Sequence, residues 1–229
     1  MMEYNGWDNL ETMKLAENYN NFLINEIVSR IRKEDDVIVD FGSGDGFFAR
    51  QTGRLSGKRI FCIEPAANMK KYYAPEQNVL DSLEMLPDGS VDFIYSLNVL
   101  EHIENDTAIA ELFYKKMKPG GILYLYLPAL SCLYSSMDKK VGHYRRYSKE
   151  SLKHLLKEEK WNVSELRYAD FLGFFATLAF KVFGNKNGNI SQGSLKFYDR
   201  FIFPFSHAAD KLTGGKVVGK NIAVTATRK

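Results

Sequence analysis

The chain has 229 residues, 45% of them hydrophobic and 26% charged, which is enough for one α/β domain with a sizeable core. Two cysteines and a polar N-terminus argue against a disulfide framework or a secretory signal, so a cytoplasmic protein is expected. The net charge of +3 is uneven, because residues 1–138 carry 13 Lys and Arg against 21 Asp and Glu, whereas residues 139–229 carry 18 against 7. The basic part suits an anionic substrate or surface, or it is a solvated basic face.

An amphipathic helix is predicted first, over residues 11–33, where apolar side chains recur at helical spacing. Tyr19 lies on its apolar stripe. An aromatic residue in this position is either part of the core or a lid over a bound ligand.

A glycine-rich turn follows a buried strand at residues 37–41 and precedes a helix that begins near Phe47. Glycines allow positive φ and let a ligand approach the backbone. The turn contains Gly42, Ser43, Gly44 and Gly46, and its Gly-x-Gly-x-Gly spacing differs from the Gly-x-Gly-x-x-Gly of dinucleotide sites. Asp40 would repel a pyrophosphate but accept a hydrogen bond from an ammonium group. The turn is predicted to cradle a ligand other than a nicotinamide dinucleotide.

A second buried strand, residues 59–63, ends at Glu64, and Pro65 then opens a helical turn. A carboxylate at the end of a second parallel strand can accept both hydroxyls of a ribose, although a surface glutamate is the alternative. A third strand is expected within residues 79–91.

The fourth strand, residues 92–98, leads into Val99–Ile103. On a helical turn Asn98, Glu101 and His102 share one face. His102 is a candidate proton acceptor near neutral pH, or a buried structural histidine. A helix over residues 106–117 and a fifth strand over 122–127 follow, separated by the Lys-Pro-Gly-Gly turn at 118–121.

These motifs resemble those of class I S-adenosylmethionine-dependent methyltransferases: the glycine turn with its preceding acid, the Leu-Glu-His-Ile element at 100–103 and the Lys-Pro-Gly-Gly turn. The resemblance implies a doubly wound, mainly parallel, seven-stranded Rossmann-like α/β sheet with helical C-terminal cap insertions. It implies S-adenosyl-L-methionine as cofactor. The implied cofactor-binding residues are Tyr19, Asp40, Gly42, Ser43, Gly44, Gly46, Glu64, Pro65, Asp81, Ser82, Leu83, Leu97 and Asn98.

Within this set, the resemblance assigns the methionine end of the cofactor to Asp40 and the glycine turn, and the ribose to Glu64. The adenine contact falls on residues 81–83. Metal-using relatives carry Glu-x-x-Glu-His after the fourth strand, whereas this chain has Asn98 in the first position. No bound metal is therefore expected.

The element at residues 142–148 resembles a subgroup associated with cell-surface glycan or lipid-carrier synthesis. It supplies His143, a second candidate for the catalytic base, and Tyr144, Arg145 and Arg146, the candidate substrate contacts. Arginine recognises carboxylate or phosphate with a planar fork, so an anionic substrate is expected. The alternative is that the arginines pair with Asp138 or Glu101 and pin the loop.

Residues 171–183 carry one charge and are too short for a membrane span, which needs about 20 apolar residues. They are a buried helix, a lid, a dimer face or a membrane-interfacial segment. A helix over 149–160, a mobile loop over 184–194, a helix over 195–212 bent at Pro204, and a closing antiparallel strand over 221–226 complete the prediction.

The whole chain, residues 1–229, is predicted to be one methyltransferase domain. It comprises a cofactor-covering helix (1–35), a cofactor-binding core (36–128), a substrate cap (129–215) and a closing strand (216–229). The expected activity is methyl transfer to a small-molecule, lipid or glycan-precursor acceptor, with a homodimer and peripheral membrane contact through 171–183 left open. A catalytically silent cofactor-binding module is the alternative. Nucleic acid is not expected, because the loop after the fourth strand lacks the Asn/Asp-Pro-Pro-aromatic element.

Overall fold

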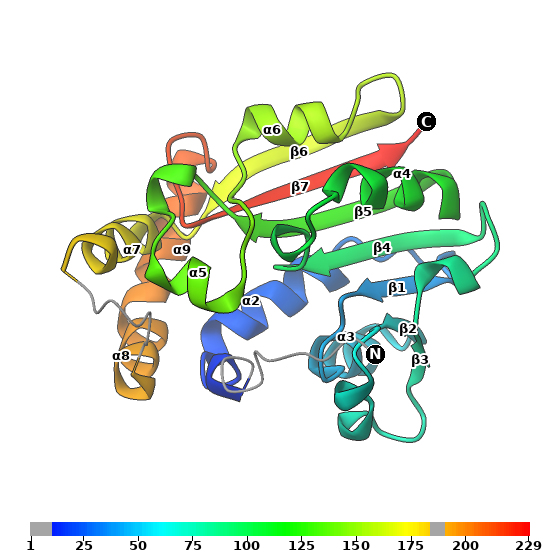
Figure 1. Ribbon diagram of the computed structural model, residues 1–229, viewed down its shortest axis with the longest axis horizontal. Coiled ribbons are helices and arrows are strands. Elements are labelled where there is room, and N and C mark those ends of the chain that lie inside the picture. Colours follow the sequence, from blue (N-terminus) through cyan, green and yellow to red (C-terminus); the bar gives the residue numbers. More distant parts are fainter. Residues whose placement is uncertain (1–10, 184–190) are drawn as a thin grey trace.

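One sheet of seven strands organises the computed structural model, which describes residues 11–183 and 191–229 (Figure 1). The strands lie in the order β3 (Asn78–Leu80), β2 (Ile60–Ile63), β1 (Ile38–Phe41), β4 (Val91–Leu97), β5 (Met117–Pro128), β7 (Asn221–Arg228) and β6 (Trp161–Ala169). Neighbours are parallel except at β7, which is antiparallel to both β5 and β6. The predicted doubly wound, mainly parallel α/β sheet is confirmed, and its strand order reverses between β1 and β4.

Helices cover both faces of the sheet, as a mainly parallel sheet requires. On one face lie α2 (Glu17–Val28), α3 (Phe47–Ser56) and α9 (Phe203–Thr213), and on the other lie α4 (Asp106–Lys116) and α6 (Lys149–Leu155). Successive strand residues feed opposite cores, so Ile38 packs in one cluster and Val39 in the other. Some of the buried polar residues, including Asp40 and Glu64, lie at the carboxyl ends of the strands.

The remaining helices gather beyond the carboxyl ends of β4 and β5 (Figure 1). They are α5 (Ser136–Val141), α7 (Phe171–Phe183), α8 (Gln192–Phe197) and a π-helical turn at Tyr198–Ile202 that leads into α9. Short 3₁₀ helices occupy Ala67–Tyr72, Leu83–Met85, Leu100–His102 and Ser131–Leu133. Ligands of open α/β sheets bind at this end of the strands.

Several element boundaries differ from the sequence prediction. The leading helix α2 covers only part of 11–33, α6 ends at Leu155, and β6 was not predicted as a separate strand. The Lys-Pro-Gly-Gly turn lies within β5, where pairing with β4 shifts from Val91–Met117 to Phe93–Ile122. A β-bulge absorbs the extra residues, so proline and glycine bend the strand instead of preceding it. The helix expected over 195–212 is divided by the π turn that precedes Pro204.

Candidate active site

The glycine turn joins β1 to α3 in a conformation that side chains would disturb. Gly42, Gly44 and Gly46 all have φ in the left-handed region, at +77°, +57° and +72°. A Cβ on Gly42 would lie 2.4 Å from Val99, and one on Gly46 would lie 2.6 Å from the Gln77 side chain. Gly46 is also the residue from which α3 starts. Glycine is therefore required at Gly42 and Gly46 by both backbone angle and space.

Asp40 lies beneath this turn at the end of β1. Its side chain is buried, and Oδ2 has no hydrogen-bond partner among the described residues. Burial raises the pKa of Asp40 to about 8, and the neighbouring carboxyls of Glu64 and Asp45 add to the rise. An unpaired carboxyl in a buried position is costly unless a ligand satisfies it. Asp40 is therefore placed to accept a hydrogen bond from a cationic group.

Glu64 ends β2 and binds the glycine turn directly. Its Oε2 accepts a hydrogen bond from the Gly44 backbone N–H at 2.9 Å, and its Oε1 accepts one from Ala66 N–H at 2.9 Å. Burial raises the pKa of Glu64, whereas these two hydrogen bonds lower it. Each carboxylate oxygen can accept a further bond, so Glu64 can hold the turn and bind a ligand hydroxyl together.

A cavity of about 640 Å³ opens beside these groups, within the usual size range of small-molecule sites. It is lined by nine of the predicted cofactor residues and by one predicted base: Gly42, Gly44, Glu64, Pro65, Asp81, Ser82, Leu83, Leu97, Asn98 and His102. Apolar residues that the sequence analysis did not single out complete the wall: Phe41, Ile63, Ala66, Val99, Ile103, Ile109 and Leu112. The cavity therefore combines an apolar wall with polar groups at the strand ends.

The three candidates for the adenine contact differ in their surroundings. Asp81 is exposed and forms an ion pair with Lys70. The Ser82 hydroxyl accepts a hydrogen bond from the Glu84 backbone N–H at 3.2 Å, which caps the short 3₁₀ helix. Leu83 is buried and joins the core under the sheet. Leu83 thus supplies an apolar surface, while Asp81 and Ser82 supply polar groups at its edge.

Asn98 adopts φ +52°, a left-handed conformation that asparagine tolerates better than most side chains. Its backbone N–H donates to the Tyr126 carbonyl at 2.8 Å, and its side-chain oxygen accepts from Asn221 at 3.4 Å. The turn directs the chain from β4 to Glu101 and His102. Asn98 therefore positions that loop as well as lining the cavity.

Four predicted cofactor residues lie outside the cavity wall in the part of the chain that the structure describes: Tyr19, Asp40, Ser43 and Gly46. Ser43 is buried and hydrogen-bonds the Tyr73 hydroxyl at 2.7 Å. Tyr19 is buried in an aromatic cluster, with ring centroids 5.3 Å from Phe203 and 6.1 Å from Tyr126. Tyr19 thus packs as a core residue and ties α2 to the cap.

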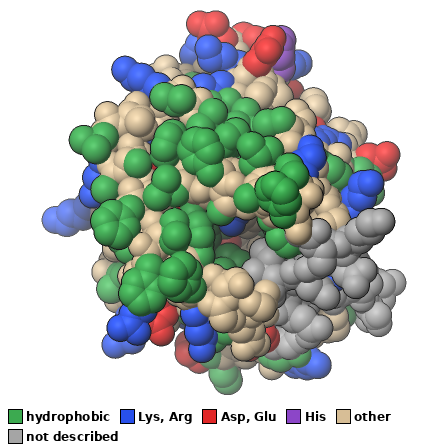
Figure 2. All heavy atoms as spheres, turned by 90° about the vertical axis from the view of Figure 1, so that its left-hand side faces the viewer, with side chains coloured by type: hydrophobic (Ala, Val, Ile, Leu, Met, Phe, Trp, Pro, Cys, Tyr) green, Lys and Arg blue, Asp and Glu red, His purple; other side chains and the backbone are tan. Residues whose placement is uncertain are grey.

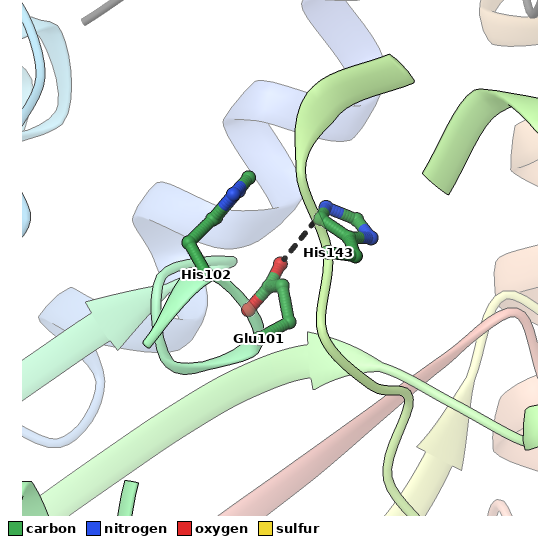
Figure 3. Close-up of side chains that lie close together, drawn as sticks. All are labelled: Glu101, His102 and His143. Carbon is green, nitrogen blue, oxygen red and sulfur yellow. Dashed lines mark ion pairs between the residues drawn. The ribbon is translucent and has the colours of Figure 1, made fainter. Parts of the chain in front are cut away.

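Three titratable side chains converge beside the cavity: Glu101, His102 and His143 (Figure 3). Glu101 and His102 come from the loop after β4, and His143 comes from the segment after α5. One potential ligand atom from each lies within 4.8 Å of the others. Such a set could accommodate a metal ion, so the expectation that no metal binds stays a prediction.

Glu101 is fully buried, and both carboxyl oxygens lack a hydrogen-bond partner in the described structure. His143 lies beside it, with Nε2 3.7 Å from Oε1. Burial raises the pKa of Glu101 to about 8, although Arg146 opposes the rise. A carboxyl with a raised pKa keeps its proton to higher pH, and in that form it can donate a hydrogen bond.

The two histidines are close but differ electrostatically. Their ring centroids are 4.6 Å apart, with the planes at 79°. Burial lowers the pKa of His102 to about 4, and the neighbouring His143 lowers it further. His102 is therefore neutral near pH 7. His143 is held by a carboxylate, because its Nδ1 lies 2.8 Å from Asp138 Oδ1.

Asp138 is the centre of a buried network that the sequence analysis named only as an alternative partner. Its carboxylate binds the Arg146 guanidinium at 2.8 and 3.0 Å and accepts the Ser135 backbone N–H at 2.9 Å. Although burial opposes it, these bonds and His143 hold the pKa of Asp138 well below its usual range. The capping-box spacing Ser135-x-x-Asp138 is a sequence signal that could have located it.

The predicted substrate arginines point to different partners. Arg146 is buried against Asp138, whereas Arg145 binds Asp106 at 2.7 Å and the Glu104 carbonyl at 2.6 Å. Tyr144 is exposed. In this structure both arginines therefore hold the loop, and the pair between Arg146 and Asp138 is the one that the alternative interpretation named. Either side chain would have to break an ion pair before it could bind a substrate anion.

Comparison with known proteins identifies the family. A family profile described as a methyltransferase domain matches residues 15–166, well over half of the chain. Malonyl-[acyl-carrier protein] O-methyltransferase of Yersinia pestis is 36% identical over 94 residues, which cover 38% of this chain and 34% of that protein. Phosphoethanolamine N-methyltransferase 2 of Caenorhabditis elegans is 25% identical over 127 residues, or 51% of this chain and 26% of that protein. The chain thus spans about a third or less of the length of these two curated relatives.

Solved structures share the fold. A methyltransferase crystallised with the Trm112 methyltransferase activator of Haloferax volcanii superposes with a TM-score of 0.64 at 15% identity, covering 98% of this chain and 95% of that one. A SAM-dependent methyltransferase from Archaeoglobus fulgidus gives 0.62 at 20% identity, covering 92% and 94%. At these identities the likeness establishes the architecture alone.

Proposed function

This chain belongs to the methyltransferase-domain family, and we propose that it transfers the methyl group of S-adenosylmethionine to a small-molecule or lipid-linked acceptor. The observation that carries the proposal is the placement of two buried carboxyls at the ends of adjacent strands: Asp40, one of whose oxygens has no partner among the described residues, and Glu64, which lines the cavity. A nucleoside bearing an ammonium group would provide hydrogen-bond donors for both carboxyls. The site residues predicted from sequence fit that cofactor.

Each part of the cofactor has a matching group. Asp40 would accept a hydrogen bond from the ammonium group of the methionine end, and Glu64 would accept ribose hydroxyls while still holding Gly44. Leu83 and the apolar wall would pack against the adenine. The cofactor supplies a methyl group already activated by its sulfonium. The protein therefore contributes mainly by holding the acceptor in line with the methyl group. In well-oriented reactions such positioning lowers the activation barrier by about 7 to 11 kcal/mol.

The proton of a hydroxyl acceptor needs a base, and His143 suits that role better than His102. With a pKa of about 4, His102 is a poor proton acceptor near neutrality. Asp138 orients His143 through Nδ1 and leaves Nε2 directed toward Glu101 and the loop after β4 (Figure 3). Asp138 thus acts as a positioning residue.

The acceptor is proposed to be anionic, in keeping with the excess of 11 positive charges in residues 139–229 (18 basic against 7 acidic). The named activities of the two curated relatives concern an acyl-carrier-bound malonyl group and a phosphoethanolamine. Both acceptors carry acidic groups. An acceptor of this kind would meet Arg145 only if its pair with Asp106 opened.

The experiment is transfer of labelled methyl from S-adenosylmethionine into a host extract, separated into lipid, glycan, small-molecule, protein and nucleic-acid fractions. Label in one fraction names the acceptor class. His143→Asn is then expected to reduce transfer to a hydroxyl acceptor by about 100-fold or more, with cofactor affinity unchanged. His154→Asn, an exposed histidine on α6, is the matched control.

Two outcomes would contradict the proposal. Absence of label from every fraction, with cofactor binding confirmed by calorimetry, would favour a catalytically silent binding module that acts as a partner subunit. Absence of cofactor binding would remove the family's activity from this chain altogether.

A further inference from the structure

The cap exposes an unusual number of large apolar side chains. They belong to α7, α8, the π turn and α9: Phe175, Leu178, Val182, Phe183, Phe197, Phe201, Phe205 and Leu212. Phe183 is 87% exposed and Phe205 is 71% exposed. Figure 2 shows hydrophobic side chains gathered over this end of the molecule. We call this set of eight residues the cap apolar surface, and a patch of this kind marks an interaction site.

Helical spacing explains how α7 presents part of this surface. Phe175, Leu178 and Val182 recur at intervals of three and four residues, which places them on one side of the helix. Gly173 and Thr177, which also share one side, are buried against the protein. The helix therefore has apolar residues on its outer side, where a solvated helix would have polar ones.

The exposed charges on the segments that carry the cap apolar surface have one sign. Within residues 171–183 and 191–215 the exposed charged side chains are Lys181, Lys196, Arg200 and Lys211. Arg200 lies over the Phe201 ring at 5.6 Å, so charge and apolar surface adjoin each other. Figure 2 likewise shows Lys and Arg beside the hydrophobic patch.

The two acidic residues in these segments do not offset that charge at the surface, because they face inward. Asp199 is buried and accepts the backbone N–H groups of Asn18 and Tyr19 at 2.9 Å. Asp210 is buried and accepts the N–H groups of Asp170 and Phe171 at 2.7 and 3.0 Å. Both carboxylates are engaged in holding the cap to the rest of the domain.

We propose that the cap apolar surface docks on a bilayer containing anionic phospholipid, with the phenylalanines entering the interface and the lysines and arginine facing the headgroups. Aromatic and aliphatic side chains beside basic ones are the combination that binds such surfaces. The positive sign of every exposed charge on residues 171–183 and 191–215 favours a bilayer whose headgroups are anionic. No helix in residues 11–183 and 191–229 is long and apolar enough to cross a membrane, so the contact is peripheral.

The surface lies apart from the cofactor cavity, so this inference is independent of methyl transfer. None of its eight residues lines the cavity. Its failure and that of the proposed activity can therefore be separated, because vesicle binding is measured without cofactor or acceptor.

The test is flotation of the whole chain with vesicles of phosphatidylglycerol and phosphatidylcholine, compared with phosphatidylcholine alone. Binding is expected only to the anionic vesicles, and it should weaken in 1 M salt, where the screening length falls from about 10 Å to about 3 Å. Phe183→Ser with Phe205→Ser should lower the partition coefficient about tenfold or more. Lys196→Glu with Lys211→Glu should also lower the partition coefficient, because negative side chains repel anionic headgroups.

The matched control is Arg54→Glu with Leu55→Ser on α3, which removes an exposed basic and an exposed apolar residue at a distance from the cap. It should leave vesicle binding unchanged. Denaturant unfolding curves that coincide in all variants would confirm that each one folds.

Several results would overturn the proposal. Vesicle binding that is absent, or equal in wild type and the two cap variants, removes the bilayer as the occupant. A wild-type dimer in sedimentation equilibrium that Phe183→Ser with Phe205→Ser dissociates, without vesicle binding, assigns the surface to a second copy. Binding of a purified Trm112-type activator that is lost in the same variants, again without vesicle binding, assigns it to a protein.

Discussion

The cofactor-binding core (residues 36–128) and the cap (residues 129–215) can be compared through four of their buried carboxyls. In the core, one oxygen of Asp40 and both oxygens of Glu101 have no hydrogen-bond partner among the described residues, which is also true of Asp170 Oδ2 in the cap. In the cap, Asp138 and Asp210 have both of their oxygens bound within the protein. The carboxyls of Asp40 and Glu101 can therefore accept a further partner, whereas those of Asp138 and Asp210 are already bound to other residues of the cap.

The same contrast holds for the apolar residues. The core buries its apolar side chains between sheet and helices, while the cap presents large ones to its surroundings. Because unsatisfied groups point to a ligand and exposed apolar groups point to a surface, the two regions are expected to respond differently to mutation. Changes in the core should alter cofactor binding, and changes in the cap network should alter stability.

The largest effect is expected from Asp138→Ala, which leaves the buried Arg146 guanidinium without its partner. Removing one member of a buried ion pair costs about 3 to 5 kcal/mol. Denaturant unfolding would measure the loss in the free energy of unfolding. Arg145→Ala, which breaks the more exposed pair with Asp106, is the comparison and should cost about 1 kcal/mol or less. Equal losses in the two variants would mean that the buried pair stabilises the fold no more than the exposed pair does.

A smaller effect is expected in the core from Glu64→Ala. Loss of the ribose hydrogen bonds should weaken S-adenosylmethionine binding by about 1 to 3 kcal/mol, measured by calorimetry. Because Glu64 also holds Gly44 and Ala66, Glu64→Gln serves as a control that keeps an acceptor for one of these bonds. An unchanged cofactor affinity in the alanine variant would remove Glu64 from the site.

Asp40→Asn should have opposite effects on stability and on binding. The folded-state pKa of about 8 lies above the unfolded value, so the stability that this carboxyl contributes is present at low pH and is lost as pH rises through about 8. The free energy of unfolding of the variant should therefore exceed that of wild type by about 1 to 3 kcal/mol at pH 8, and the two should be nearly equal at pH 4. It should also bind the cofactor more weakly.

Unfolding curves at the two pH values and calorimetry with S-adenosylmethionine check both halves of that prediction. A variant that is less stable than wild type at pH 8 would show that the Asp40 carboxyl is satisfied in the folded protein. Such a result would also weaken the contrast between core and cap.

The smallest effect is expected from metal removal. Since Asn98 stands where metal-using relatives carry a glutamate, dialysis against a chelator should change methyl transfer by less than about twofold, within the precision of a rate comparison. Readdition of Mg²⁺ or Zn²⁺ should likewise have no effect. Activity lost to the chelator and restored by one ion would assign Glu101, His102 and His143 as its ligands.

The sequence alone was sufficient for the fold and for many of the residues that line the cavity, because those signals are local. Glycines that need positive φ, acids that end buried strands and the apolar runs between them sit next to one another in the chain. A parallel sheet then brings the strand ends to one edge, so Gly42, Glu64, Leu83 and Asn98 meet without further information.

The partners of long-range polar residues were decided only by the tertiary structure. The sequence left open whether Arg145 and Arg146 face a substrate or the loop, and folding pairs them with Asp106 and Asp138. It likewise left residues 171–183 as core, lid or surface, and packing buries one side of α7 while exposing the other. Composition specifies which groups need partners, but the packing of helices onto the sheet determines which partners come within reach.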